Sequence, residues 1–253
     1  MRRLDDGGWQ RLRVYTSITS PDFLPQLKVL LRSARPHRDL EHIVLVQSEW
    51  QPPELMALMR ETQAKVVEHQ ALWALQIKEA LARLRLNTTN DSLTQMGLMA
   101  RFDVPLLHAS ALLERPLSWI VDNAVEAAKA IRARPLLLDR VTLYVDADTF
   151  WMHSMARHIL SGKVRVPSLW AASSESDVRN YDHFNAGVML FNVPEYLEAY
   201  AGMLASLTSN KFACLRVALD QGCLQFLSRE RDVMDEPDSK LAPQWCASGA
   251  ASD

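Results

Sequence analysis

The sequence predicts an α/β fold, with a mostly parallel central sheet flanked by helices. Short apolar runs alternate with segments in which apolar residues recur at helical spacing. Parallel strands need crossover connections, which helices usually supply, so this alternation indicates a layered sheet. The chain has 253 residues, of which 48% are apolar, and can bury one large core. We therefore expect one domain over residues 1–246.

Strand and helix patterns alternate from the start of the chain. Residues 12–18 form an apolar run typical of a strand, and Asp22 stands as the N-cap of a helix over 23–33. The next expected elements are strands at 42–46 and 65–68 and helices at 53–64 and 72–86. This order predicts that the first three strands lie parallel in the sheet.

A long helical segment, a predicted insertion at about residues 70–140, then separates these strands from the next one. Helical patterns over 96–113 and 117–134 delay that strand until residue 142. The later expected elements are helices at 152–160, 195–207 and 220–229 and a strand at 188–191. Residues 247–253 are small and polar, so we expect a disordered tail there.

Charge and composition limit which binding partners and which cellular compartment are expected. The formal charge is −2 and no long basic block occurs, which argues against a nucleic-acid groove. The first residues lack the apolar core of a signal peptide, and no apolar run is long enough to span a bilayer. We therefore expect a cytoplasmic protein without a transmembrane segment; a Golgi or secretory lumen location would apply only to a fragment. Composition does not indicate the oligomeric state.

The three cysteines do not form a recognisable pattern. Cys214, Cys223 and Cys246 lack the paired short spacing of a zinc site and the number expected of a disulfide framework. We expect them to be reduced thiols.

Two carboxylates end a run of residues that is typical of a buried strand. Residues 143–145 are followed by Asp146 and Asp148, and side chains two residues apart in an extended backbone point the same way. Carboxylate oxygens select a hard cation, Mg²⁺ or Mn²⁺, which usually keeps waters and substrate phosphates as its other ligands. The pair therefore predicts a metal site for a substrate that carries a diphosphate.

Polar residues also follow the first strand. Ligands of open α/β sheets collect beyond the carboxyl ends of strands, so a nucleotide is expected to lie across the ends of the first strand and the acidic strand. Ser17 and Thr19 then offer hydroxyl and backbone groups to the base or ribose. A strand-exit turn with a helix cap explains residues 17–22 equally well.

Three ordered motifs carry a family resemblance. They are Leu-Tyr-Val-Asp-Ala-Asp-Thr at residues 143–149, Phe-Asn-Ala-Gly-Val-Met-Leu-Phe-Asn at 184–192 and Asp-Gln-Gly at 220–222. Together with residues 16–25 they resemble glycosyltransferase family 8, the glycogenin-like sugar transferases. The resemblance implies a GT-A fold and a nucleotide-sugar donor, expected to be a UDP-sugar. It also implies Mn²⁺ or Mg²⁺ as cofactor and transfer of a hexose with retention of anomeric configuration. The acceptor, whether glycan, glycolipid or protein, is not indicated.

The resemblance also implies residue roles. Asp146 and Asp148 would hold the metal, with Asp146 also near the donor ribose. Asp220 and Gln221 would lie beneath the transferring sugar, where a carboxylate and an amide stabilise positive charge that develops at the anomeric carbon. Asp182 would line the donor sugar and the acceptor.

Further donor contacts are implied for Asn185 and Gly187, where a glycine lets the backbone approach a ligand closely. Lys129 lies at about the distance before the acidic strand at which the family keeps a cation for the donor phosphates. Arg132 and Arg134 fit that role equally well by charge, and a solvated helix face is the favoured interpretation for Lys129 itself.

The chain departs from the family in two places. The family's C-terminal signature, a His and Gly followed by Lys-Pro-Trp, supplies a third metal ligand, yet no such segment follows Trp245 and the last histidine is His183. The helical insertion is the second departure, and a plain helical cover for the sheet is favoured over an acceptor lid.

Two alternative functions stay open. The missing signature suits a domain that binds nucleotide sugar without turning it over. Residues 145–149 also resemble the Asp-x-Asp nucleophile strand of haloacid-dehalogenase-type phosphatases, in which Asp146 would be the nucleophile and Asp148 the general acid.

Overall fold

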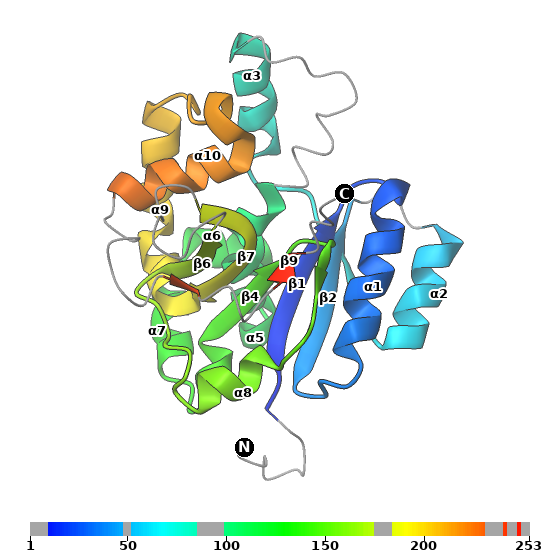
Figure 1. Ribbon diagram of the computed structural model, residues 1–253. Coiled ribbons are helices and arrows are strands. Elements are labelled where there is room, and N and C mark those ends of the chain that lie inside the picture. The colour runs from blue at the N-terminus through cyan, green and yellow to red at the C-terminus, as the bar shows by residue number, and fades with distance from the viewer. Residues whose placement is uncertain are drawn as a thin grey trace.

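The computed structural model describes residues 10–47, 52–84, 99–174, 184–230, 240–241 and 247–248. Its central sheet has seven strands in the order β3-β2-β1-β4-β7-β6-β8 (Figure 1). Their bounds are β1 Leu12–Ile18, β2 Leu40–Val46, β3 Lys65–Glu68, β4 Val141–Val145, β6 Trp170–Ser174, β7 Phe184–Asn192 and β8 Lys240–Leu241. Within this sheet β7 runs against the other six strands, which are parallel to one another. The predicted mostly parallel α/β sheet is confirmed.

Helices cover both faces of this sheet (Figure 1). One face carries α1 (Leu24–Ala34), α2 (Pro53–Thr62) and α8 (Met155–Leu160). The other face carries α3 (Ala74–Leu84), α5 (Val104–Leu113), α6 (Leu117–Asp122), α7 (Ala124–Arg132), α9 (Val193–Ser209) and α10 (Leu215–Glu230). Short 3₁₀ turns are η1 (Pro21–Phe23), η2 (Ala100–Asp103) and η3 (Leu137–Asp139).

The alternation of side chains along each strand supplies both cores. In β4, Leu143 and Val145 pack under α1 and α8, whereas Tyr144 between them faces the α5 and α9 layer. Val14 and Tyr15 of β1 divide between the same two layers. Every residue of β4 is buried because helices lie on both sides, which is why this strand reads as a continuous apolar run.

Several boundaries differ from the sequence expectation. Asp22 does not cap α1, whose N-cap is Phe23 without a side-chain cap bond; Asp22 lies in the preceding η1, where its backbone donates a hydrogen bond to the hydroxyl of the N-cap Ser20. The predicted helix over 117–134 breaks into α6 and α7 at Asn123. The Asn123 side chain donates to the Trp119 carbonyl at 2.9 Å, the kind of local bond by which Asn competes with a continuous helix.

The helical insertion packs against the sheet. Tyr196 of α9 donates to the Phe102 carbonyl of η2 at 2.8 Å, and α5 lies against β4. Its described helices therefore cover one sheet face. Residues 85–98 lie outside the described part.

Two strand pairs were missed in the sequence. β6 consists of small residues after Trp170 and joins β7 through a register shift between Ala172 and Ser173. β5 (Thr149–Phe150) pairs with β9 (Ala247–Ser248), so these two tail residues are ordered and the expected disorder is wrong for them. Such two-residue strands have no periodicity to detect.

No helix in the described ranges is both long and apolar enough to cross a membrane.

A fully buried histidine makes folding sensitive to acid. His108 of α5 is 1% exposed and its Nε2 lies 3.0 Å from the Asp139 carbonyl. Burial, and secondarily the charge of Arg13, lowers the pKa of His108 to about 3. The unfolded chain therefore binds a proton at pH values where the folded chain does not, and stability is lost as the pH falls below the ordinary histidine pKa.

We expect the unfolding free energy to drop by about 1.4 kcal/mol per pH unit between about pH 6 and pH 4 from this group alone. Urea unfolding at several pH values measures that slope. The substitution His108→Leu should remove the contribution of His108 to this slope. An unchanged slope in the variant would contradict the role given to His108.

Candidate functional site

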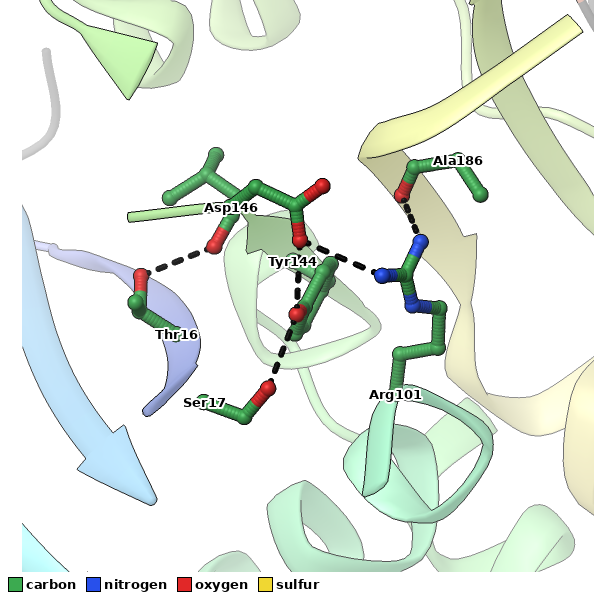
Figure 2. A network of polar contacts seen from close by, with 7 residues as sticks. Thr16, Ser17, Arg101, Tyr144, Asp146 and Ala186 are labelled. Atoms are coloured by element: carbon green, nitrogen blue, oxygen red, sulfur yellow. Dashed lines mark hydrogen bonds and ion pairs between the residues drawn. The ribbon is translucent and has the colours of Figure 1, made fainter. Parts of the chain in front are cut away.

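The site lies where β1 and β4 end side by side. These strands are parallel neighbours, with Tyr15 of β1 opposite Tyr144 of β4. Ser17 in β1 and Asp146 after β4 therefore reach the same edge of the sheet. Thr16 fixes the register between them, since its hydroxyl donates to the Val145 carbonyl at 2.9 Å (Figure 2).

A chain of hydrogen bonds runs from Ser17 to Asp146. The Tyr144 hydroxyl donates to Oδ1 of Asp146 at 2.9 Å, and Ser17 Oγ lies 2.9 Å from the same hydroxyl. Because the single phenolic proton goes to the carboxylate, Ser17 must donate to Tyr144. Burial, and then the charge of Asp146, raises the pKa of Tyr144 above its ordinary value, which keeps this proton in place. Ser17 and Asp146 are thus held as one unit.

Arg101 completes the unit from a third direction. It comes from η2, and its guanidinium donates to the Ala186 carbonyl at 2.7 Å and to Oδ1 of Asp146 at 3.2 Å (Figure 2). The guanidinium carbon lies 4.8 Å from the centre of the Tyr144 ring, within the range of a cation–π contact. The Arg101 side chain is 4% exposed, whereas Asp146 is 31% exposed. A buried cation therefore neutralises the inner oxygen of a carboxylate whose surface is partly open.

β7 supplies the opposite wall. The Asp146 backbone donates to the Gly187 carbonyl at 2.7 Å, which continues the antiparallel pairing of β4 with β7 past the end of β4. Asn185 lies two residues earlier in β7 and pairs in register with Ser173. The segment that carries Asn185 and Gly187 is therefore attached directly to the acidic strand.

Asp148 is the exposed member of the acidic pair. Partial desolvation, and then the negative charge of Asp146, raises the pKa of Asp148. A divalent cation would relieve this repulsion, and two carboxylate oxygens suit Mg²⁺ or Mn²⁺. In the described part of the chain no group of three or more His, Cys, Asp or Glu residues forms a metal site. Asp146 and Asp148 fit a metal that takes its other ligands from substrate and water.

The other residues predicted along the strand ends, the motifs and the later helix differ in how much of each the structure describes. Thr19 is half-buried just beyond β1, two residues after Ser17. Asp220 and Gln221 belong to α10, which packs against β7, but their side chains are outside the described part of the structure, as is that of Asn185. Asp182 and His183 lie wholly outside the described residues.

Lys129 is exposed on α7 near Glu198 of α9, where the hydrogen bond from Arg132 and, least, the charge of Lys129 lower the pKa of the Glu198 carboxyl. Helix α7 leads through η3 into the start of β4, whereas Asp146 follows the end of that strand. The cation that the structure brings to Asp146 is Arg101. Sequence reasoning missed its role, although one signal was present: an arginine within the apolar segment 99–109 needs a buried partner.

A disulfide brackets the Asp220–Gln221 segment. Cys214 and Cys223 are bonded, with their Cα atoms 4.8 Å apart, so the expectation of reduced thiols is wrong for this pair. Their nine-residue separation gave no signal because the pairing depends on how the intervening chain folds back. Cys246 lies outside the described residues.

The sheet and its helices have the GT-A type fold, so the fold that the motifs led us to expect is confirmed. No family model matches the sequence, and no curated protein matches it.

Solved structures do match the fold. The glycosyltransferase GlyE from Streptococcus pneumoniae TIGR4 has 15% identity and a TM-score of 0.54, over 93% of this chain and 46% of that one. Mouse xyloside xylosyltransferase 1 has 13% identity and a TM-score of 0.51, over 92% and 84%. An active-site mutant of LgtC has 14% identity and a TM-score of 0.52, over 85% and 70%. This chain thus spans less than half the length of GlyE.

Removing the buried cation should destabilise the fold. In Arg101→Met the Ala186 carbonyl and the inner oxygen of Asp146 lose their donor, and breaking a buried ion pair costs up to about 3–5 kcal/mol. Since Asp146 is partly solvated, we expect a loss of about 2 kcal/mol in the free energy of unfolding. Urea titration measures this loss. The control is Lys129→Met, at an exposed position, which should lower the free energy of unfolding by less than about 0.5 kcal/mol. Equal effects of the two substitutions would contradict the role of Arg101.

Reduction should also destabilise the protein. The Cys214–Cys223 bridge closes a short loop, and its loss should lower the unfolding free energy by roughly 2–3 kcal/mol. Alkylation under native, non-reducing conditions followed by peptide mass spectrometry should find both cysteines unmodified. Reductant should bring the parent chain to the stability of Cys223→Ser; full alkylation without reductant would show that the bridge does not form.

Proposed function

We propose that this protein is a metal-dependent, retaining glycosyltransferase that moves a hexose from a nucleotide-sugar donor, with a UDP-sugar expected, to an acceptor. One observation carries the proposal. At the carboxyl ends of two neighbouring parallel strands, Ser17 and Asp146 are joined through Tyr144, and Asp148 stands exposed two residues further on. In open α/β sheets this edge is where nucleotides bind.

The donor would lie across these strand ends. Ser17 and Thr19 suit contacts with the base or ribose, and Asp146 and Asp148 suit the metal. Such a metal, when bound, would supply positive charge that stabilises the departing diphosphate. Arg101 and Tyr144 both bind the inner oxygen of Asp146 and so restrict its rotamer. The orientation of the carboxylate is therefore fixed before any ligand arrives.

The family resemblance supports roles for residues beyond this network. Asn185 and Gly187 on β7 would line the sugar, since β7 is bonded directly to the Asp146 backbone. Asp182 would lie beside the acceptor, and Asp220 and Gln221 would stabilise positive charge that develops at the anomeric carbon. The likeness to family 8 in the three motifs is the reason for proposing retention.

The phosphatase alternative fits less well. A nucleophilic Asp146 would need a reactive carboxylate oxygen, yet its inner oxygen accepts hydrogen bonds from Tyr144 and Arg101. The antiparallel β7 next to the acidic strand and the glycosyltransferase-like fold also favour sugar transfer.

Calorimetric titration of UDP tests the donor site. We expect binding with Mn²⁺ and little with chelator, and at least about tenfold weaker binding in Asp148→Asn, because removing one carboxylate weakens the metal–diphosphate contact. The exposed Asp122→Asn is the matched control, in which affinity should not change.

UDP-sugars would then be screened for turnover, and the anomeric configuration of the product read by NMR. Manganese-dependent binding without any turnover would support the alternative of a nucleotide-sugar binder. UDP binding that ignores Mn²⁺ and Asp148 would refute the metal-dependent donor site.

A further inference from the structure

A polar cavity lies at the opposite edge of the sheet, where the parallel strands begin. It has a volume of about 520 Å³, and the sequence neighbours of three strand starts line it. Arg11 directly precedes β1, Arg38 lies in the turn before β2, and Lys65 is the first residue of β3. Since Asp146 follows the other end of β4, this cavity is distinct from the proposed donor site, and the inference does not depend on the proposed function.

Positive charge predominates in this cavity, although the chain as a whole has a net charge of −2. Its lining has four cationic side chains, Arg11, Arg35, Arg38 and Lys65, and two carboxylates. The carboxylates, Glu41 and Glu61, are already neutralised.

Glu41 binds Lys65 at 2.5 Å and Arg13 at 3.1 Å, and Glu61 binds Arg32 at 2.8 Å. Arg13 and Arg32 are further cations that do not belong to the lining, so each carboxylate has more than one positive partner nearby. By contrast, no ion pair engages Arg11 or Arg38 within the described residues, and both are exposed. Their guanidinium groups remain available for an anion.

A buried imidazole in the lining also lacks a partner. His42 of β2 is 8% exposed, and its Nε2 has no hydrogen-bond partner in the described structure. The ring packs edge-on against Trp151 at 5.7 Å, which restricts its orientation. Burial, and then the charge of His37, lowers the pKa of His42 to about 4, so the ring is neutral and can carry its proton on Nε2. An unsatisfied buried donor costs free energy that a ligand oxygen would recover.

We propose that this cavity binds a phosphate-bearing anion of two or more negative charges through Arg11, Arg38 and the Nε2 proton of His42. Guanidinium groups present paired N–H donors that match phosphate oxygens, whereas a cationic or apolar ligand finds no complement here. The same chemistry is offered by a soluble phosphorylated compound and by a phospholipid headgroup.

Inorganic pyrophosphate is the first probe, titrated by calorimetry with EDTA so that no divalent metal supports the donor site. About 150 mM NaCl suppresses non-specific attraction to surface charge. Arg11→Gln/Arg38→Gln should weaken binding by at least about tenfold, because each lost guanidinium removes a charge-assisted hydrogen bond. Lys78→Gln/Arg229→Gln removes the same charge from exposed sites on α3 and α10 and should leave the affinity unchanged.

NMR of labelled histidine rings gives a local readout. Pyrophosphate should shift the His42 ring signals in the parent chain and not in Arg11→Gln/Arg38→Gln. Folding of that variant is checked by its unperturbed His108 signals.

Cosedimentation with phosphatidylglycerol-containing vesicles, and with phosphatidylcholine vesicles as blank, distinguishes the two sources. Binding that depends on Arg11 and Arg38 supports the site. Such binding of pyrophosphate indicates a soluble phosphorylated ligand, and such binding of the vesicles indicates a phospholipid headgroup. The proposal is overturned if neither probe binds, or if both double variants bind equally.

Discussion

The buried guanidinium of Arg101 connects the parts on which the candidate site depends. It comes from the helical insertion, and it binds the Asp146 carboxylate after β4 and the Ala186 carbonyl in β7. A charge that is 4% exposed requires partners, and these partners are the acidic strand and the strand that carries Asn185 and Gly187. The helical insertion therefore both covers the sheet and contacts the candidate site through Arg101. It supplies the cation that sets the position of the Asp146 carboxylate, and Tyr144 links that carboxylate to Ser17 on β1.

Parallel strand order separates the two polar edges of the molecule. All carboxyl ends of β1, β2, β3 and β4 lie at one edge, where Ser17 and Asp146 meet, and all amino ends lie at the other. Residues that are far apart in the chain, such as Arg11, Arg38 and Lys65, are thereby collected at the amino edge. One topology thus creates an edge with exposed acidic groups and an edge with exposed basic groups, although the net charge of the chain is close to zero.

The elements that the sequence predicted are those with strong local signals. The β1 strand over Leu12–Ile18 and the β3 strand over Lys65–Glu68 have the expected bounds, because apolar runs between turn residues determine them. Asp146 follows β4 as the apolar run before it predicted, whereas Asp148 lies in a turn closed by a hydrogen bond from the Thr149 backbone to the Asp146 carbonyl at 3.1 Å, not on the extended backbone that was expected. Arg101, the Cys214–Cys223 bridge and the β5–β9 pair depend on contacts between distant segments, which no local pattern contains. Lys129 was considered on sequence distance alone, and distance along an insertion of several helices does not translate into distance in space.

The β5–β9 pair lies next to the acidic pair of residues. Thr149, the residue after Asp148, lies opposite Ser248, so a late segment of the chain does return to the acidic strand. The residues of that segment that pair there are Ala247 and Ser248, which offer no imidazole. Within the described residues, a metal at Asp146 and Asp148 would have these two carboxylates as protein ligands, with substrate phosphates and water among its other ligands. Because such a site is completed by the diphosphate itself, metal and nucleotide should bind as a coupled pair, each increasing the affinity for the other by the same factor.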